Sequence, residues 1–190
     1  MIFDINARIS NRHVHLTKET YELLFDEEIS KKYDLNQIGE YASNQTLTIR
    51  NGDKIIENVR VLGDFRKYNQ VEISRRDARI LGVNPPVRRS GDLEDSLYIT
   101  LETKKGSVEV KGLIIANRHV HINTTEASKY GVTDKQIVKI EIPGDKSGIV
   151  DAEVKISDNG YYELHVDTDD ANAFMLEDND KVKLIVWVFI

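Results

Sequence analysis

The 190-residue chain has no cysteine, few prolines and no long hydrophobic run. Without cysteine there is no disulfide, no thiolate metal ligand and no cysteine nucleophile. The longest wholly apolar run, residues 184–190, is far shorter than the roughly 20 residues that span a bilayer. Residues 1–6 lack the basic region and the apolar core of a secretory signal. We therefore expect a cytoplasmic protein that does not act on a membrane.

Positive charge is also scarce, because the formal net charge is −6. This balance argues against a general nucleic-acid binder, which needs a basic surface to neutralise phosphates. The basic residues are unevenly spread, however, since residues 60–89 hold eight basic and three acidic side chains. A local basic region on an acidic protein indicates a small anionic ligand.

The chain contains an internal repeat. The pentapeptide Asn-Arg-His-Val-His occurs at residues 11–15 and again at 117–121. In both copies an apolar segment precedes it and a helix-capping pattern follows it. A second pair of segments, 71–78 and 164–171, also aligns and places Glu72 at the position of His165. The chain therefore reads as two copies of one unit.

The hydrophobic pattern predicts a mainly β protein. Period-two alternation recurs in short segments along both repeats, with turn residues between them. The predicted helices are short and cover about residues 17–32, 75–81, 125–130 and 169–175. Short strands at close spacing favour two similar small β-barrel units, each capped by short helices. A doubly wound parallel sheet is disfavoured because the pattern shows no long crossover helices.

All five histidines lie in the repeated segments. Each repeat begins with a His-x-His pair, and residues i and i+2 of a strand point to the same face. The alignment supplies a third ligand for each pair. The candidate ligand sets are His13, His15 and Glu72 in the first repeat and His119, His121 and His165 in the second.

Three nitrogen or oxygen ligands with one open coordination position are typical of catalytic zinc. Ligands rich in nitrogen also suit iron, nickel, copper or cobalt, so zinc is a preference among divalent metals. Two such sites brought together would form a dinuclear centre. The sequence leaves open whether they meet.

Arginine is frequent near these segments. Arg12 and Arg118 precede the histidine pairs and point to the opposite strand face, so we interpret them as structural ion-pair partners. Arg66 lies six residues before Glu72, and Ser90-Gly91-Asp92 forms a turn with a hydroxyl and backbone N–H groups. Such groups suit phosphate capture, although an ordinary surface turn explains residues 90–92 equally well.

These motifs resemble the PduL-type phosphotransacylases, or phosphate propanoyltransferases, in order and over nearly the whole chain. The resemblance implies two β-barrel units with strand exchange between them. The first unit would cover residues 16–115, with a barrel core at about 40–112. The second would cover 116–190 and be completed by the N-terminal strand 1–15. The matching segments are 10–16, 70–74, 86–93, 116–121 and 164–172.

The resemblance further implies two zinc ions on the two ligand sets, and phosphate contacts from Arg66 with Ser10 and Ser90 close by. The implied reaction is acyl-CoA + phosphate ⇌ acyl phosphate + CoA, so the partners are coenzyme A, acyl-CoA, phosphate and acyl phosphate. The sequence leaves open whether the protein forms a homo-oligomer. A short basic helix also suits the phosphates of coenzyme A, although a plain surface role explains it equally well. The basic residues of this helix are Arg75, Arg76 and Arg79.

Members of this family that reside in bacterial microcompartments carry an N-terminal targeting extension. The first motif here begins at Ser10, which leaves no room for one. The expectation is therefore a free cytosolic protein.

Two alternatives fit part of the pattern. A cupin-like oxygenase or isomerase would use His13-x-His15 with Glu19, or His121 with Glu126. Both glutamates, however, fall in the first turns of predicted helices, where acids are favoured by the helix dipole. A non-catalytic metal-binding protein is the second alternative. A TIM-barrel hydrolase, which shares the His-x-His start, needs about 250 residues and does not fit this length.

Overall fold

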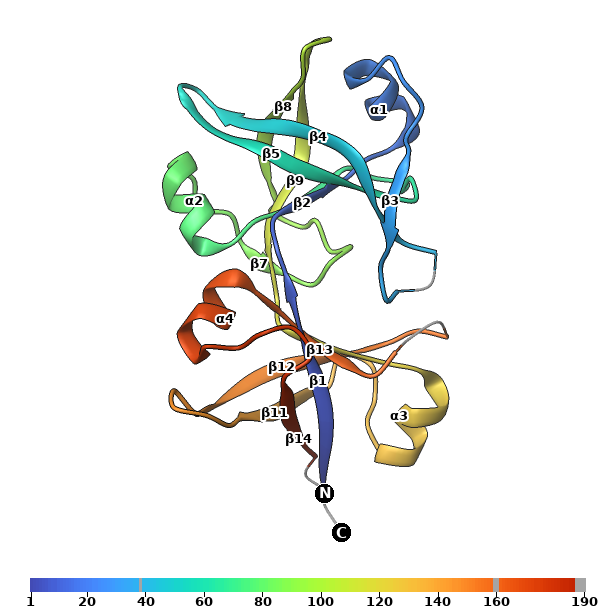
Figure 1. Ribbon diagram of the computed structural model, residues 1–190, viewed down its shortest axis with the longest axis vertical. Helices are drawn as coiled ribbons and strands as arrows, with labels where there is room; N and C mark the ends of the chain where they lie inside the picture. The colour runs from blue at the N-terminus through green and yellow to red at the C-terminus, as the bar shows by residue number, and fades with distance from the viewer. Residues whose placement is uncertain (38, 159–160, 187–190) are drawn as a thin grey trace. The chain divides into compact units, whose positions relative to one another are not determined.

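The computed structural model describes residues 1–37, 39–158 and 161–186. It divides into two compact units, residues 11–116 and residues 1–10 with 117–190. Each unit contains a six-stranded barrel of mixed parallel and antiparallel strands with two short helices (Figure 1). The predicted fold class, two similar small barrels with short helices, is confirmed.

In the unit of residues 11–116, each barrel strand is hydrogen-bonded to the next and the last returns to the first. The parallel pairs are β2 with β5 and β6 with β9. Two further short strands extend this sheet, and two helices complete the unit. In barrel order the strands are β2 (His13–His15), β5 (Lys54–Gly63), β4 (Tyr41–Asn51), β8 (Leu97–Glu102), β9 (Ser107–Ala116) and β6 (Gln70–Glu72). The other elements are β3 (Lys31–Asp34), β7 (Val87–Arg88), α1 (Lys18–Leu24) and α2 (Arg75–Leu81).

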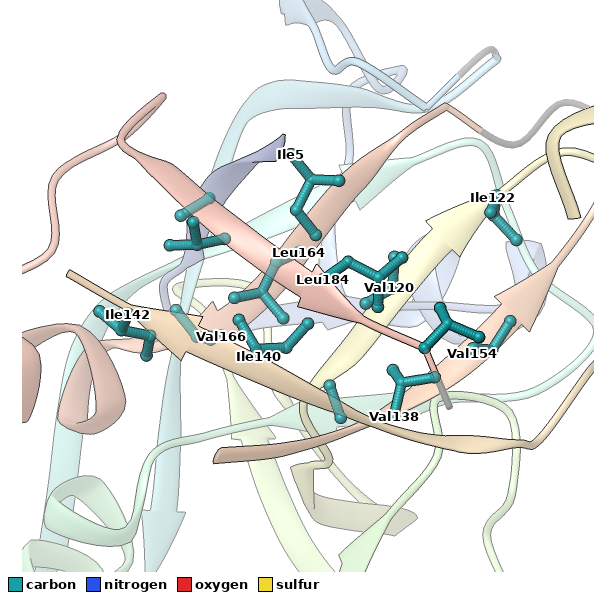
Figure 2. Packing of buried hydrophobic residues seen from close by; sticks show 14 of the residues in the cluster. Ile5, Val120, Ile122, Val138, Ile140, Ile142, Val154, Leu164, Val166 and Leu184 are labelled. Carbon is teal, nitrogen blue, oxygen red and sulfur yellow. The ribbon is translucent and has the colours of Figure 1, made fainter. Parts of the chain in front are cut away.

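The other unit repeats this arrangement with different segments of the chain. Its barrel closes through β1, which pairs with β13 on one side and β14 on the other. Alternate strand residues fill the interior, among them Val120, Ile140, Leu164 and Leu184, which are fully buried (Figure 2). In barrel order the strands are β1 (Ile2–Ser10), β13 (Glu163–Asp167), β10 (His119–Ile122), β12 (Gly148–Ile156), β11 (Ile137–Ile142) and β14 (Lys181–Ile185). The helices are α3 (Thr124–Tyr130) and α4 (Thr168–Phe174).

The two sequence repeats exchange one strand each, as the fold prediction stated. Strand β1 runs into β2 of the first repeat but pairs with β13 and β14 of the second. Strand β9 runs into β10 but pairs with β6, β7 and β8. The chain therefore passes between units at Ser10–Asn11 and at Ala116–Asn117, the same point of the repeat. The exchanged N-terminal strand ends at Ser10, whereas the expected one extended to residue 15, because β2 pairs with β5 and β6.

The helices begin where the sequence places capping residues. Thr17, Ser74 and Asn123 each accept a hydrogen bond from a backbone N–H in the first turn, and Ser74 forms a full capping box with Asp77. For α4 the cap is Asp167, whose side chain accepts from the backbone N–H groups of Asp169 and Asp170. Within the described ranges, no helix is both long and apolar enough to cross a membrane.

Helix α1 is shorter than the predicted 17–32. It stops at Phe25, whose backbone is extended, and residues 31–34 form β3 instead. Three acidic residues, 26–28, follow the end of the helix, where negative charge opposes the helix dipole. Lys105 Nζ contacts the carbonyl oxygens of Glu22 and Phe25 at 2.7 and 3.0 Å. A distant cation therefore satisfies the terminal carbonyls at the point where the helix ends.

Gly112 in β9 lies at a close approach of two backbones. Its φ is +142°, and a Cβ built there would lie 2.3 Å from the carbonyl oxygen of Asn69. We expect Gly112→Ala to lower the free energy of unfolding by about 1–3 kcal/mol, as overpacking usually does. Urea denaturation measures this change. Gly106→Ala is the control, because a Cβ there meets nothing within 4 Å; equal loss in both variants would contradict the interpretation.

Candidate metal centres

The histidine pairs lie on the strand face opposite the barrel interior. Val14, between His13 and His15, is fully buried in the core of its barrel. Because strand residues alternate, the two histidines project from the outer face of β2. Residues on that face are normally exposed, yet His13 and His15 are only 8% and 2% exposed. Both imidazole rings are therefore buried although neither belongs to the barrel core.

The first ligand group is assembled by the pairing of β2 with β6. His13 lies directly opposite Glu72 in the register, and His13 Nε2 is 3.6 Å from Glu72 Oε2. Potential ligand atoms of His13, His15 and Glu72 all lie within 4.8 Å of one another. His13 Nδ1 is 2.8 Å from the carbonyl oxygen of Asn11. With Nδ1 as the donor to that carbonyl, the lone pair of Nε2 is left for a metal.

The second ligand group has the same construction in the other unit. His119 lies opposite His165 across β10 and β13, and its Nε2 is 3.1 Å from Nε2 of His121. The three rings offer ligand atoms within 4.8 Å of one another. His119 Nδ1 is 2.9 Å from the carbonyl oxygen of Asn117. The repeated asparagine carbonyl therefore orients the first histidine of each pair.

Both groups fit a divalent cation. Each supplies three nitrogen or oxygen ligands on a face away from the core, and leaves coordination positions for water or substrate. The donor set of three imidazoles suits borderline metals, and the set with Glu72 adds one carboxylate. The predicted ligands are therefore brought together within each unit, and the two groups are possible metal sites.

The arginine of each repeat motif forms an ion pair at the same repeat position. Arg12 Nη1 is 3.0 Å from Asp77 Oδ1, and Arg118 Nε is 2.8 Å from Asp170 Oδ2. The hydrogen bond to Asp170 raises the pKa of Arg118. Each aspartate lies in the first turn of the helix that follows the third ligand. These arginines therefore tie the histidine strand to that helix, which is the structural role expected of them.

Arg66 and Ser90, the predicted phosphate contacts, are hydrogen-bonded neighbours. Arg66 Nη1 is 3.4 Å from Ser90 Oγ, and Nη2 donates to Glu40 Oε1 at 2.6 Å. Ser90 Oγ also accepts from Gln70 Nε2 at 2.9 Å, and the same nitrogen donates to Glu72 Oε1 at 2.5 Å. A continuous polar chain therefore joins Arg66 to the candidate ligand Glu72.

Sequence reasoning missed Glu40 and Gln70 as members of this chain. A signal for Gln70 was present, because it lies two residues before Glu72 on a strand and so shares its face. No local signal marks Glu40, which reaches Arg66 only through the fold.

Two other side chains complete the surroundings of the second group. Tyr161 Oη is 3.0 Å from His165 Nε2, and its ring stacks on His121 with centroids 4.9 Å apart. Glu163 lies opposite His121 in the register and is 8% exposed. Neither was among the predicted site residues, although both precede His165 by an even number of positions on or next to its strand.

The remaining predicted residues lie elsewhere. Ser10 ends β1 opposite Asp167, in the other unit from Ser90. Burial raises the pKa of Asp167, which caps α4. The three arginines expected to bind coenzyme A are exposed on α2, whose Asp77, Ala78 and Leu81 are buried. These arginines are Arg75, Arg76 and Arg79.

The glutamates required by the cupin alternative do not join the histidines. Glu19 and Glu126 lie in the first turns of α1 and α3. Glu19 is exposed, and a hydrogen bond from its own backbone lowers its pKa. In the described part of the chain, the clustered ligand sets use Glu72 and His165 instead.

Known proteins with similar sequences share one description. The sequence profile described as phosphate propanoyltransferase matches residues 6–177. The chain belongs to the phosphate propanoyltransferase family. It is 48% identical to the phosphate propanoyltransferase of Thermotoga maritima over 93% of this chain and 87% of that protein. Identity to the Clostridioides difficile protein of the same name is 41%, over 89% of this chain and 83% of that one.

The Salmonella typhimurium phosphate propanoyltransferase is 40% identical over 87% of this chain and 80% of its own length. Membership of this family makes the chain an acyltransferase. The match includes both histidine pairs, Glu72 and His165, because all of them lie within residues 6–177.

Proposed function

We propose that this chain transfers a short acyl group between coenzyme A and phosphate, in the reaction acyl-CoA + phosphate ⇌ acyl phosphate + CoA. The names of the three relatives describe a propanoyl group and phosphate. Propanoyl or acetyl is the acyl group that we assign.

The observation that carries the proposal is the polar chain from Arg66 through Ser90 and Gln70 to Glu72. It sets an anion-binding guanidinium beside a candidate metal ligand within one unit. Both Arg66 and its partner Glu40 have side chains only 19% exposed. A guanidinium held in this way is preorganised for the dianion of phosphate, which it can contact through its remaining N–H groups.

We assign one divalent cation, preferably zinc, to each ligand group. The groups are His13, His15 and Glu72, and His119, His121 and His165. When bound, the cations supply Lewis-acid stabilisation of the negative charge that develops on the thioester oxygen or on the departing thiolate.

The residues of the chain bind and orient the reactants for a direct displacement. Arg66 holds phosphate so that one of its oxygens attacks the thioester carbonyl carbon. The C–O bond forms, the C–S bond breaks, and its electron pair leaves on the sulfur of coenzyme A. An acyl-enzyme on sulfur is excluded because the chain has no cysteine. Ser90 adds a hydroxyl beside Arg66. A phosphate contact from Ser10 stays a prediction.

The exposed basic face of α2 is our proposal for binding the phosphates of coenzyme A. Its three arginines are exposed at positions i, i+1 and i+4 of one short helix. Such a face attracts phosphates by its charge alone. Each single exposed arginine therefore contributes modestly to the binding free energy. The residues are Arg75, Arg76 and Arg79.

Thiol release from acyl-CoA tests the proposed reaction. We expect release that depends on phosphate, with two metal equivalents per chain, and that is lost on chelation and restored by zinc. Acetyl-, propanoyl- and butanoyl-CoA, measured side by side, define the acyl preference. Two bound metals without thiol release would favour the non-catalytic metal-binding alternative. Release independent of phosphate would contradict acyl transfer to phosphate.

A further inference from the structure

Gln70 is a completely buried amide at the centre of the first ligand group. It lies on β6 directly opposite His15 in the register, and its exposed fraction is 0%. Its side chain makes three hydrogen bonds. Oε1 accepts from the backbone N–H of Gly91 at 2.8 Å, and Nε2 donates to Glu72 Oε1 at 2.5 Å and to Ser90 Oγ at 2.9 Å.

The chemistry of these partners fixes the orientation of the amide. The Gly91 N–H can only donate, so the amide oxygen must face it. The NH₂ group then faces Glu72 and Ser90, with one N–H for each acceptor. Rotating the amide by 180° would set its oxygen against the Glu72 carboxylate and its NH₂ against a donor. One orientation is therefore strongly preferred for this fully buried amide.

This orientation determines which oxygen of Glu72 is available to a metal. Oε1 is engaged by Gln70, whereas Oε2 is the oxygen that lies 3.6 Å from His13 Nε2. Gln70 therefore holds the Glu72 carboxylate in one orientation, with Oε2 toward His13. Hydrogen-bonded supports of this kind set the position and basicity of metal ligands.

The same amide determines what Ser90 can do. Ser90 Oγ accepts from Gln70 Nε2 and faces Arg66 Nη1 at 3.4 Å, so donors already occupy its acceptor side. Its own hydroxyl hydrogen must then point to another acceptor. Beside a guanidinium, the natural acceptor is an oxygen of the bound anion.

We propose that Gln70 is a positioning residue that couples the two halves of this site. It holds Glu72, as a metal ligand, in one orientation with Oε2 toward His13, and it turns the Ser90 hydroxyl into a donor for phosphate. The role of Gln70 at Ser90 rests on the proposed function, whereas its role at Glu72 concerns metal binding alone.

The other unit supports a positioning role for this strand position. Glu163 occupies the same place in the repeat, opposite His121 and two residues before His165. Its Oε2 lies 3.8 Å from His165 Nε2. The same oxygen lies 3.7 Å from Arg8 Nε. In both units a polar side chain at this position therefore lies beside the third ligand.

Gln70→Met tests the proposal, with Gln45→Met as a matched control. Gln45 is also a buried glutamine of the same barrel, 6% exposed, and it bonds to Glu27 and Ser30 away from the ligands. Zinc affinity is measured by competition with a chromophoric chelator on the full-length protein. For Gln70→Met we expect one of the two zinc equivalents to bind about 10- to 100-fold more weakly. The second equivalent serves as an internal reference.

Kinetics at saturating zinc separate the two halves. For Gln70→Met we expect the KM for phosphate to rise about 3- to 10-fold, the effect of one lost hydrogen bond, with the KM for acyl-CoA unchanged. Gln70→Glu keeps the shape of the side chain and removes both N–H donors. It should therefore weaken zinc binding and raise the KM for phosphate, as Gln70→Met does. It serves as the second variant should Gln70→Met unfold.

Zinc affinity and phosphate KM equal to those of Gln45→Met would overturn the proposal. Weaker zinc binding with an unchanged phosphate KM would overturn the coupling to Ser90. If the wild-type protein released no thiol with phosphate, the proposed function would fail, but the zinc titration would still decide the role of Gln70 at Glu72.

Discussion

His119→Ala should remove one metal equivalent per chain and abolish acyl transfer. The Nε2 atoms of His119 and His121 are 3.1 Å apart, and the third ligand, His165, lies opposite His119. With alanine, only two protein ligands remain. We expect a loss of affinity larger than the roughly 10- to 100-fold typical of outer partners of a metal ligand. Metal analysis after dialysis and a phosphate-dependent thiol-release assay measure the two effects.

The barrel itself should survive this change. Val120, the neighbour on the opposite face of β10, is fully buried in the core, whereas His119 projects outward. Thermal unfolding of the metal-free proteins should therefore give similar midpoints for variant and wild type. Lys139→Ala is the control, because it breaks an exposed ion pair on β11 of the same barrel and such pairs contribute little. Unchanged turnover with full metal content in His119→Ala would remove the assignment.

Arg66→Ala should raise the phosphate requirement far more than the acyl-CoA requirement. Arg66 is hydrogen-bonded to Glu40 at 2.6 Å and lies near Ser90. Its guanidinium group is therefore held in place before phosphate binds. Hydrogen bonds to a charged group are worth about 1.5–3 kcal/mol. We therefore expect the KM for phosphate to rise about 10- to 100-fold, with the KM for acyl-CoA changed little. Initial rates over a matrix of both substrates give the two constants.

Two variants sharpen this test. Arg66→Lys should restore little, because an ammonium cannot bond to Glu40, Ser90 and phosphate in one plane. Arg50→Ala removes an arginine that pairs with Glu102 in the same barrel, away from the ligands, and should leave both KM values near those of the wild type. Equal increases in both constants for Arg66→Ala would argue against a role specific to phosphate.

Much of the fold could be predicted from local patterns. Three of the four helices lie within one residue of their predicted bounds, because caps such as Ser74 and Asn123 act within a few residues of chain. The exception, α1, ends where Lys105 from a distant turn meets its carbonyl oxygens. Local sequence holds no information about that contact. The apolar run of residues 184–190 begins in β14, and residues 187–190 lie outside the described residues.

The candidate site also combines residues that local sequence patterns predicted with residues that only the fold brings together. The histidine pairs are set by strand alternation, and the repeat alignment supplied Glu72 and His165, which the cross-strand register places beside them. Glu40 escaped prediction because it meets Arg66 across 26 residues of chain. Gln70 was within reach of the alternation rule, but its role depends on the turn at Gly91, which only the folded chain brings to it.

By itself, the sequence determined the duplication, the mainly β character, the absence of cysteine chemistry and the ligand types, since composition and periodicity carry all of these. Tertiary structure decided which strand completes which barrel and which polar groups meet. An isolated strand has unpaired N–H and C=O groups on both edges, and its side-chain pattern does not determine which strand pairs with it. Hence β1 pairs with β13 and β14 although the chain leads it directly into β2.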